Sequence, residues 1–167
     1  PFLQPHQGAI ENLLRKHIWE SQTHGIKWQL KEGCFLDKID SCPAADVVFF
    51  DLYSPKTCGD LWNLGVMNNI YRKIVKTPPG IFLTFSAATS VRSALLSAGF
   101  HVGYGISTSL KLETTVASPN PELIARPLDK RWIARFQRST HRLPSDWVEG
   151  EQSFVKRILA SPQFSEK

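Results

Sequence analysis

A chain of 167 residues with 42% hydrophobic and 21% charged residues has about the size and composition of one folded domain. No apolar run approaches the roughly 18 residues that a membrane-spanning helix needs, and no signal-peptide pattern opens the chain. The excess of 20 basic over 15 acidic residues gives a net charge of +5, which permits a polyanionic partner without requiring one.

The first predicted elements lie within residues 7–39. Apolar residues recur at helical spacing over residues 7–20, which predicts an amphipathic helix. Alternating residues predict a short strand at 27–30, and residues 35–39 suit one or two helical turns. We therefore expect a helix, a strand and a short helix before the first strongly apolar segment.

The next predicted elements form a sheet. The continuous apolar runs at residues 46–50 and 81–85 are typical of parallel strands that are covered on both faces. Residues 100–106 and 114–117 predict two more strands with no helix between them, which indicates an antiparallel hairpin at one edge. Because helices are predicted between the other strands, the pattern favours an α/β fold with a mostly parallel sheet.

Two helices are predicted between these strands. The apolar face at residues 62–74 predicts one helix with Asp60 as its N-cap, and residues 91–98 predict another with Ser90 as its N-cap. Gly99 follows the second helix at the position that favours a left-handed residue.

Residues 119–167 differ in character, so we predict a basic helical extension that packs on an α/β domain of residues 1–118. Residues 126–142 hold six Arg or Lys against one acid, Asp129, so this segment carries a formal charge of +5. Arginines on one side of a net-basic helix are typical of RNA contacts, although a solvated charged face fits the same pattern. The arginines of this helix that we expect to contact RNA are Arg131, Arg135 and Arg138.

The sequence predicts no metal site. Cys34, Cys42 and Cys58 form no CxxC pair, which indicates free thiols in a reducing cytoplasm. The five histidines show no metal-ligand spacing with an acid or a cysteine. The serines lie in no Gly-x-Ser-x-Gly pattern, which argues against a hydrolase nucleophile.

The stretch DVVFFDLYSPKTCGDLW, residues 46–62, places Asp51 directly after a buried strand. Ligands of open α/β sheets bind beyond the carboxyl ends of the strands, so Asp51 is a candidate site residue. Tyr53, Ser54 and Pro55 add an aromatic face, a hydroxyl group and a fixed bend. This combination suits a flat substrate that stacks on Tyr53 with a nitrogen held toward Asp51. An aspartate that only caps a turn is the alternative interpretation.

Three motifs in residues 46–118 resemble those of the MnmC-type tRNA methyltransferases. They are the stretch quoted above, PPGIFLTFSAATSVRSALLSAGFHVG and KLETTVAS. The resemblance implies a class I, Rossmann-like methyltransferase sheet and methyl transfer from S-adenosyl-L-methionine to the exocyclic amine of 5-aminomethyl-2-thiouridine at the tRNA wobble position. It also implies a cytoplasmic protein with tRNA as its partner, and an FAD-dependent oxidase domain that is either fused or separate.

The resemblance also implies roles for individual residues. Asp51 would orient the amine or act as its base, because a carboxylate accepts a charge-assisted hydrogen bond from an ammonium group. Gly33 and Cys34 stand where the family has a Gly-Asp pair that reads the adenine of the cofactor. The other predicted contacts are Asp51 and Leu52 with the cofactor, Tyr53, Ser54, Pro55 and Lys111 with the substrate, and Arg92 with RNA.

Two elements that hold the cofactor in this family are not found in the sequence, namely a Gly-rich loop and an acidic residue after the second strand. The strand at residues 27–30 would also lack a neighbour. We therefore expect upstream residues to be missing and residues 1–167 alone to bind the cofactor poorly. Two alternatives stay open: a non-catalytic RNA-binding or interaction domain on a truncated or decayed methyltransferase fold, and a methyltransferase that acts on a small-molecule or protein amine.

Overall fold

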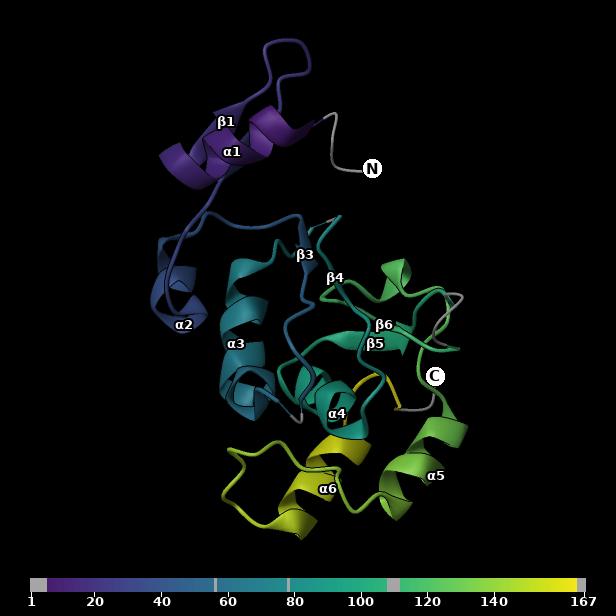
Figure 1. Ribbon diagram of the computed structural model, residues 1–167. Helices are drawn as coiled ribbons and strands as arrows, with labels where there is room; N and C mark the ends of the chain where they lie inside the picture. Colours follow the sequence, from purple (N-terminus) through teal and green to yellow (C-terminus); the bar gives the residue numbers. More distant parts are fainter. Residues whose placement is uncertain (1–5, 56, 78, 108–111, 165–167) are drawn as a thin grey trace. The chain divides into compact units, whose positions relative to one another are not determined.

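The computed structural model describes residues 6–55, 57–77, 79–107 and 112–164 (Figure 1). Its contacts divide the chain into two compact units, Pro1–Ser41 and Cys42–Lys167. This division differs from the predicted boundary after Ser118, because the C-terminal helices belong to the same unit as the main sheet. No helix within the described segments is long and apolar enough to cross a membrane.

The first unit contains a small two-stranded sheet. Helix α1 (Gln7–Lys16) precedes strands β1 (Ile18–Glu20) and β2 (Lys27–Gln29), which pair in antiparallel fashion. The short helix α2 (Phe35–Lys38) and a 3₁₀ turn (Ile39–Ser41) complete this unit.

Two predictions for the first unit were wrong. The helix predicted over residues 7–20 ends early, because His17 adopts a left-handed φ of 58° and its N–H donates to the Leu13 carbonyl oxygen. The chain then forms β1, whose Trp19 lies opposite Trp28 of β2 with the ring centroids 5.9 Å apart. Strand β2 therefore has a neighbour, contrary to the prediction.

The second unit is built on a four-stranded mixed sheet in the order β3-β4-β6-β5 (Figure 1). Strands β3 (Val47–Phe49) and β4 (Ile81–Thr84) run parallel. Strand β6 (Thr115–Ser118) runs antiparallel both to β4 and to β5 (His101–Tyr104). Strands β3, β4 and β5 therefore point the same way, and β6 is inserted between β4 and β5.

This arrangement confirms an α/β fold but corrects the predicted sheet. Strands β5 and β6 pair in antiparallel fashion as expected, because no helix connects them. This hairpin lies at one edge of the sheet, as predicted, but β6 is the strand of the hairpin that pairs with β4, and it does so in antiparallel fashion. The parallel pairing β3–β4 is therefore the one parallel pairing among these four strands, and the sheet is mostly antiparallel instead of mostly parallel. Three of the four residues of β6 are buried, as expected for a strand with neighbours on both sides.

Helices connect and follow these strands. Short 3₁₀ turns at Gly59–Trp62 and Pro121–Leu123 precede α3 and α5, respectively. The α-helices of the second unit are α3 (Leu64–Lys73), α4 (Thr89–Ser97), α5 (Lys130–Arg138) and α6 (Glu151–Leu159).

Two N-caps differ from the prediction. Asn63 caps α3, with its Oδ1 accepting a helix N–H at 2.9 Å, because the preceding 3₁₀ turn takes up Asp60 before the helix begins. Ala88 stands at the N-cap of α4, so Ser90 lies within that helix. Gly99 follows α4 with a φ of 103°, which confirms the predicted left-handed end.

The C-terminal helices share a core with the sheet. Trp132 and Phe136 of α5 are buried and stack with their ring centroids 5.4 Å apart, and Phe136 contacts Phe154 of α6. Helix α6 in turn packs against α4. Because burying one such side chain contributes about 1.5–3 kcal/mol, these contacts hold α5 and α6 firmly on the second unit.

A buried arginine joins α4 to the start of β6. The Arg92 side chain has no exposed surface, and its Nε donates to Thr115 Oγ1 at 3.0 Å. Its two terminal nitrogens donate to Glu113 Oε2 at 3.1 Å and to the Thr114 carbonyl oxygen at 3.0 Å. Burial lowers the pKa of Arg92, while Glu113 acts in the opposite direction, and the guanidinium stays charged. This burial corrects the prediction that Arg92 contacts RNA.

We predict that Arg92→Met lowers the free energy of unfolding by about 1.5–4 kcal/mol, because it removes the three hydrogen bonds of the buried guanidinium, each worth about 0.5–1.5 kcal/mol. Urea unfolding followed by circular dichroism measures this change. Arg72→Met is the control, because Arg72 is exposed on α3, and it should change the free energy by less than about 0.5 kcal/mol. Equal losses in the two variants would contradict this role of Arg92.

Candidate functional site

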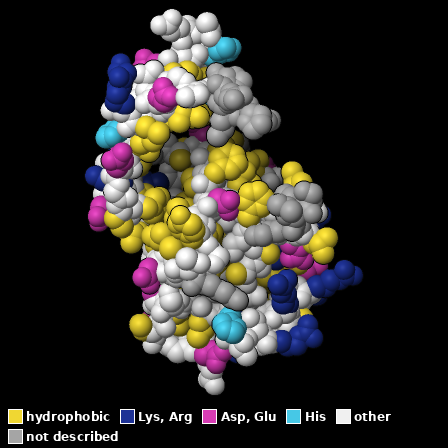
Figure 2. Space-filling model, viewed as in Figure 1, with side chains coloured by type: hydrophobic (Ala, Val, Ile, Leu, Met, Phe, Trp, Pro, Cys, Tyr) yellow, Lys and Arg dark blue, Asp and Glu magenta, His cyan; other side chains and the backbone are white. Residues whose placement is uncertain are grey.

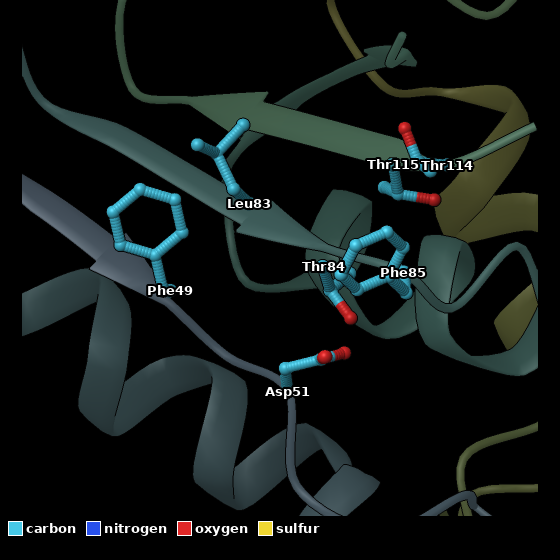
Figure 3. A pocket seen from close by; sticks show the side chains of 7 residues that line it. All are labelled: Phe49, Asp51, Leu83, Thr84, Phe85, Thr114 and Thr115. Carbon is cyan, nitrogen blue, oxygen red and sulfur yellow. The ribbon is translucent and has the colours of Figure 1, made fainter. Parts of the chain in front are cut away.

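A hollow of about 180 Å³ opens where β3 and β4 end (Figure 3). We call it the sheet-edge hollow. Its walls come from the last residues of these two strands and from the start of β6, which lies at the same edge because β6 runs in the opposite direction. The lining residues are Phe49, Asp51, Leu83, Thr84, Phe85, Thr114 and Thr115.

The position of Asp51 follows from the way β3 ends. Phe50 is buried, its N–H donates to a β4 carbonyl oxygen at 2.8 Å, and its ring packs on Trp62 and Phe82. Because Phe50 anchors the chain to the sheet, the residue after it emerges at the sheet edge. Figure 3 shows the Asp51 carboxylate turned toward the Thr84 side chain.

Within the described part of the chain, Asp51 is the one ionisable residue that lines the sheet-edge hollow. Two hydroxyl groups near it are bound within the protein: Thr114 donates to the Ile106 carbonyl at 2.8 Å, and Thr115 donates to the Ser86 carbonyl at 2.6 Å. Much of the remaining lining is aromatic or aliphatic. A carboxylate beside phenyl rings suits a cationic group or an amine, so this hollow can orient a charged nitrogen.

The loop that follows β3 is held by Trp62. The Trp62 side chain is buried, and its indole Nε1 donates to the Tyr53 carbonyl oxygen at 2.8 Å. The N–H groups of Thr57 and Cys58 both donate to the Ser54 carbonyl oxygen. Tyr53 is 77% exposed, so its ring can receive a planar group. Tyr53 and Ser54 are close to Asp51 in the chain but are not among the lining residues.

The predicted cofactor contacts do not all lie at this hollow. Gly33, with a φ of 122°, and the exposed Cys34 precede α2 in the first unit, so their contact with the cofactor stays a prediction. Leu52 is 36% exposed in the loop after β3, and Pro55 is half-buried there. Lys111 lies outside the described residues.

The predicted RNA contacts of the basic helix also stay predictions. Arg131, Arg135 and Arg138 are exposed on α5. Figure 2 shows Lys and Arg side chains gathered over the part of the molecule where Figure 1 draws α5. Within the described segments, no group of three His, Cys, Asp or Glu side chains could hold a metal ion.

Sequence reasoning did not identify most of the residues that line the sheet-edge hollow. Thr84 and Phe85 end the strand beside β3, so the rule that identified Asp51 could also have found them. Thr114 and Thr115 could not be found in this way, because their position depends on the insertion of β6. Phe49 was placed in a strand covered on both faces, yet it is 79% exposed.

Comparison with known proteins gives consistent matches. Residues 13–120 match a family model described as S-adenosyl-L-methionine-dependent methyltransferase. The crystal structure of MnmC2 from Aquifex aeolicus is similar to 93% of this chain, with a TM-score of 0.68 and 24% sequence identity, which shows a shared fold. An uncharacterized protein of Methanocaldococcus jannaschii is 33% identical over 83 residues, or 50% of this chain. The chain spans 52% of the MnmC2 chain and 23% of the M. jannaschii protein.

We predict that Trp62→Phe loosens the loop after β3 while keeping the buried ring. The lost hydrogen bond to Tyr53 should lower the free energy of unfolding by about 0.5–1.5 kcal/mol. Amide exchange at Thr57 and Cys58 should become faster, because these N–H groups belong to the same loop. Hydrogen exchange measured by NMR checks this expectation.

Trp147→Phe is the matched control for this prediction. Trp147 Nε1 donates to the Gly150 carbonyl oxygen at 3.0 Å, so the control also removes one indole hydrogen bond. It should leave amide exchange at Thr57 and Cys58 unchanged. Equal acceleration in both variants would mean that Trp62 does not hold the loop.

Proposed function

This chain belongs to the S-adenosyl-L-methionine-dependent methyltransferase family, and on that premise we propose that it methylates the exocyclic amine of 5-aminomethyl-2-thiouridine at the wobble position of tRNA. The observation that carries the proposal is the Asp51 carboxylate, the one ionisable group among the described residues that line the sheet-edge hollow. The motifs in residues 46–118 support it, as does the likeness of the fold to MnmC2. We also propose that strands β3 to β6 correspond to part of a class I methyltransferase sheet.

The sheet-edge hollow fits the reacting end of S-adenosyl-L-methionine, the cofactor of the family. The Asp51 carboxylate and the rings of Phe49 and Phe85 suit a positively charged sulfonium group. However, a hollow of about 180 Å³ is smaller than the roughly 300–1,000 Å³ of pockets that enclose a whole ligand. The nucleoside of the cofactor therefore needs contacts beyond this hollow, for which Gly33, Cys34 and Leu52 are the proposed residues.

Asp51 has two tasks in the proposed reaction. When bound, the cofactor supplies an electrophilic methyl group on a sulfonium sulfur. Asp51 accepts a charge-assisted hydrogen bond from the aminomethyl group of the uridine and thereby orients its nitrogen. The ammonium form must lose a proton before its lone pair can attack, and the carboxylate either accepts that proton or directs it to water. With that proton removed, Asp51 would hold the nitrogen toward the methyl group that the cofactor would supply.

The loop after Asp51 offers a place for the base. The exposed ring of Tyr53 can stack on the uracil, as aromatic side chains do with unstacked RNA bases. The hydrogen bond from Trp62 fixes the backbone of Tyr53, so the ring stays near the sheet edge. Ser54 and Pro55 follow it and would contact the edge of the base. The exposed arginines of α5 suit the tRNA backbone.

A non-catalytic RNA-binding domain is the second candidate function. The small volume of the sheet-edge hollow favours it, because the described lining cannot enclose a whole cofactor. This candidate predicts that the protein binds tRNA without transferring a methyl group. Methyl transfer by the natural gene product that contains this sequence separates the two candidates.

We predict that Asp51→Asn lowers kcat for methyl transfer about 10²–10⁴-fold, because an amide neither carries the charge that holds an ammonium group nor accepts its proton. Transfer of a labelled methyl group to undermodified tRNA by the natural gene product measures kcat. Asp60→Asn is the control, because Asp60 is exposed in the 3₁₀ turn Gly59–Trp62 and does not line the hollow. Full activity in a folded Asp51→Asn variant would remove the proposed role.

A further inference from the structure

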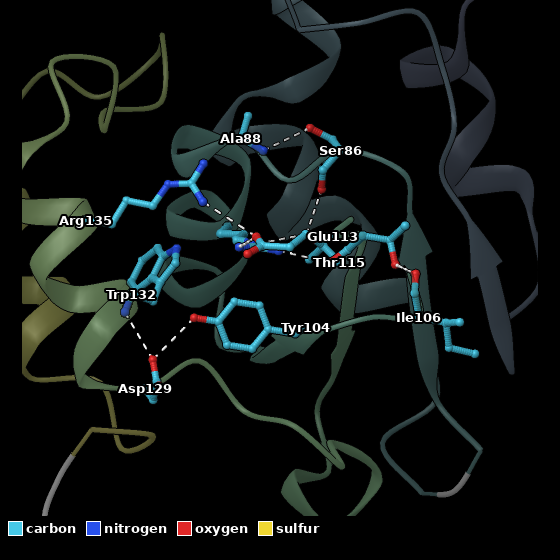
Figure 4. Close-up of polar contacts among 11 residues, drawn as sticks. Ser86, Ala88, Tyr104, Ile106, Glu113, Thr115, Asp129, Trp132 and Arg135 are labelled. Carbon is cyan, nitrogen blue, oxygen red and sulfur yellow. Dashed lines mark hydrogen bonds and ion pairs between the residues drawn. The ribbon is translucent and has the colours of Figure 1, made fainter. Parts of the chain in front are cut away.

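A second hollow, of about 380 Å³, lies between the end of β5 and the start of α5. We call it the α5 hollow. Three arginines line it, Arg126, Arg131 and Arg135, together with the acids Glu113 and Asp129. Figure 4 shows Arg135, Glu113 and Asp129. Because it is larger than the sheet-edge hollow and mostly polar, it can receive a charged group.

Asp129 is already bound within the protein. Its Oδ1 accepts the N–H groups of Arg131 and Trp132, each at 3.1 Å, and so caps α5. It also accepts the Tyr104 hydroxyl at 3.3 Å. Burial acts to raise the pKa of Asp129, but the hydrogen bonds from Trp132 and Tyr104 outweigh it and lower that pKa. Asp129 is therefore a charged cap of α5, and it offsets one of the three arginine charges of the hollow.

Glu113 is also paired, which leaves an excess of positive charge. Its Oε2 lies 3.1 Å from Arg92 and 3.5 Å from Arg135, so two guanidinium groups share one carboxylate. Among the described residues, no carboxylate forms an ion pair with Arg126 or Arg131. The α5 hollow therefore favours an anion.

Trp132, which lines this hollow, carries a buried donor without a partner among the described residues. Trp132 lines the hollow and is 1% exposed, and within the described part of the chain its indole Nε1 has no acceptor. Figure 4 shows this nitrogen on the side of the ring that faces Glu113 and Arg135. A buried N–H without an acceptor costs about 1–3 kcal/mol. A ligand oxygen in the hollow would satisfy it, so the ligand is an anion with acceptor oxygens.

The two hollows adjoin each other through Arg92. Its guanidinium donates to Thr115, which lines the sheet-edge hollow, and to Glu113, which lines the α5 hollow. A polymer that places one group in the first hollow can therefore place a neighbouring group in the second. RNA carries a phosphate at each nucleotide, and guanidinium groups match phosphate oxygens in geometry.

We propose that the α5 hollow binds a backbone phosphate of the RNA whose modified uridine enters the sheet-edge hollow, an inference that rests on the proposed function. Arg126 and Arg131 line the α5 hollow and donate to the phosphate oxygens. The indole N–H of Trp132 donates to one of these oxygens. Arg92 and Glu113 act as positioning residues, because they fix Arg135 and the start of β6 without reaching the ligand.

The indole N–H signal of Trp132 in an NMR spectrum of the ¹⁵N-labelled protein tests this site directly. Trp132→Phe assigns the signal, and the protein is titrated with inorganic phosphate and, separately, with a short RNA of anticodon-loop sequence. We expect both probes to shift the Trp132 signal. The Trp147 signal serves as the internal control, because its indole already donates to Gly150, and it should stay in place.

Arg131→Gln tests the same site through RNA affinity. Arg131 is exposed, so the fold should survive, and the cap of α5 uses only its backbone N–H. We expect the affinity for the RNA to fall roughly tenfold and the salt dependence of binding to weaken by about one phosphate contact. Lys156→Gln removes an exposed cation from α6 and should change neither quantity.

The outcomes separate this inference from the proposed function. The phosphate site is overturned if the Trp132 signal moves with neither probe and if Arg131→Gln and Lys156→Gln bind RNA with equal affinity. This holds even if tRNA is methylated. A signal that shifts with inorganic phosphate but not with RNA also overturns it as an RNA site. A shift with both probes in a protein that transfers no methyl group supports the site and removes only the proposed function.

Discussion

The Arg92 side chain is positively charged and has no exposed surface, and the acceptors of its hydrogen bonds all belong to residues 113–115. Taking a guanidinium out of water costs several kcal/mol, so α4 and the start of β6 can be buried together only when these hydrogen bonds form. Such an arrangement adds little stability relative to apolar side chains of the same size. It does favour one register, because a shifted β6 would leave the charge uncompensated. The insertion of β6 into the sheet is therefore coupled to the position of α4.

Residues 113–115 also separate two chemical environments. Thr114 and Thr115 line the sheet-edge hollow, where Asp51 is an acid among apolar side chains. Glu113 lines the α5 hollow, where arginines outnumber acids. The first environment favours a cation and the second an anion. Because the three residues are consecutive, one ligand with a basic nitrogen and a nearby phosphate can occupy both. A modified nucleotide within RNA has this combination of charges.

Local patterns in the sequence predict the elements but not all of their partners. The strand that ends before Asp51 could be predicted, because its apolar run and the strand-end rule depend only on neighbouring residues. The insertion of β6 could not, because residues 114–117 have the same pattern at an edge as inside a sheet. Arg92 was taken for a surface residue, since its acceptors lie more than 20 residues later in the chain. Strand β1 was not predicted, because the helical spacing of apolar residues continues past His17 in the sequence. The left-handed backbone of His17 ends the helix there.

The indole of Trp132 is best understood as a group that the unbound protein leaves unsatisfied. A phenylalanine at this position would keep the stacking against Phe136 and Phe164, at centroid distances of 5.4 and 5.9 Å, without burying an unpaired N–H. The unpaired donor costs about 1–3 kcal/mol in the free protein, and apolar packing gives no reason for it. A ligand oxygen that accepts this N–H recovers that cost when it binds. The same group that destabilises the free fold then contributes to affinity, and it does so only for ligands that present an acceptor at that point.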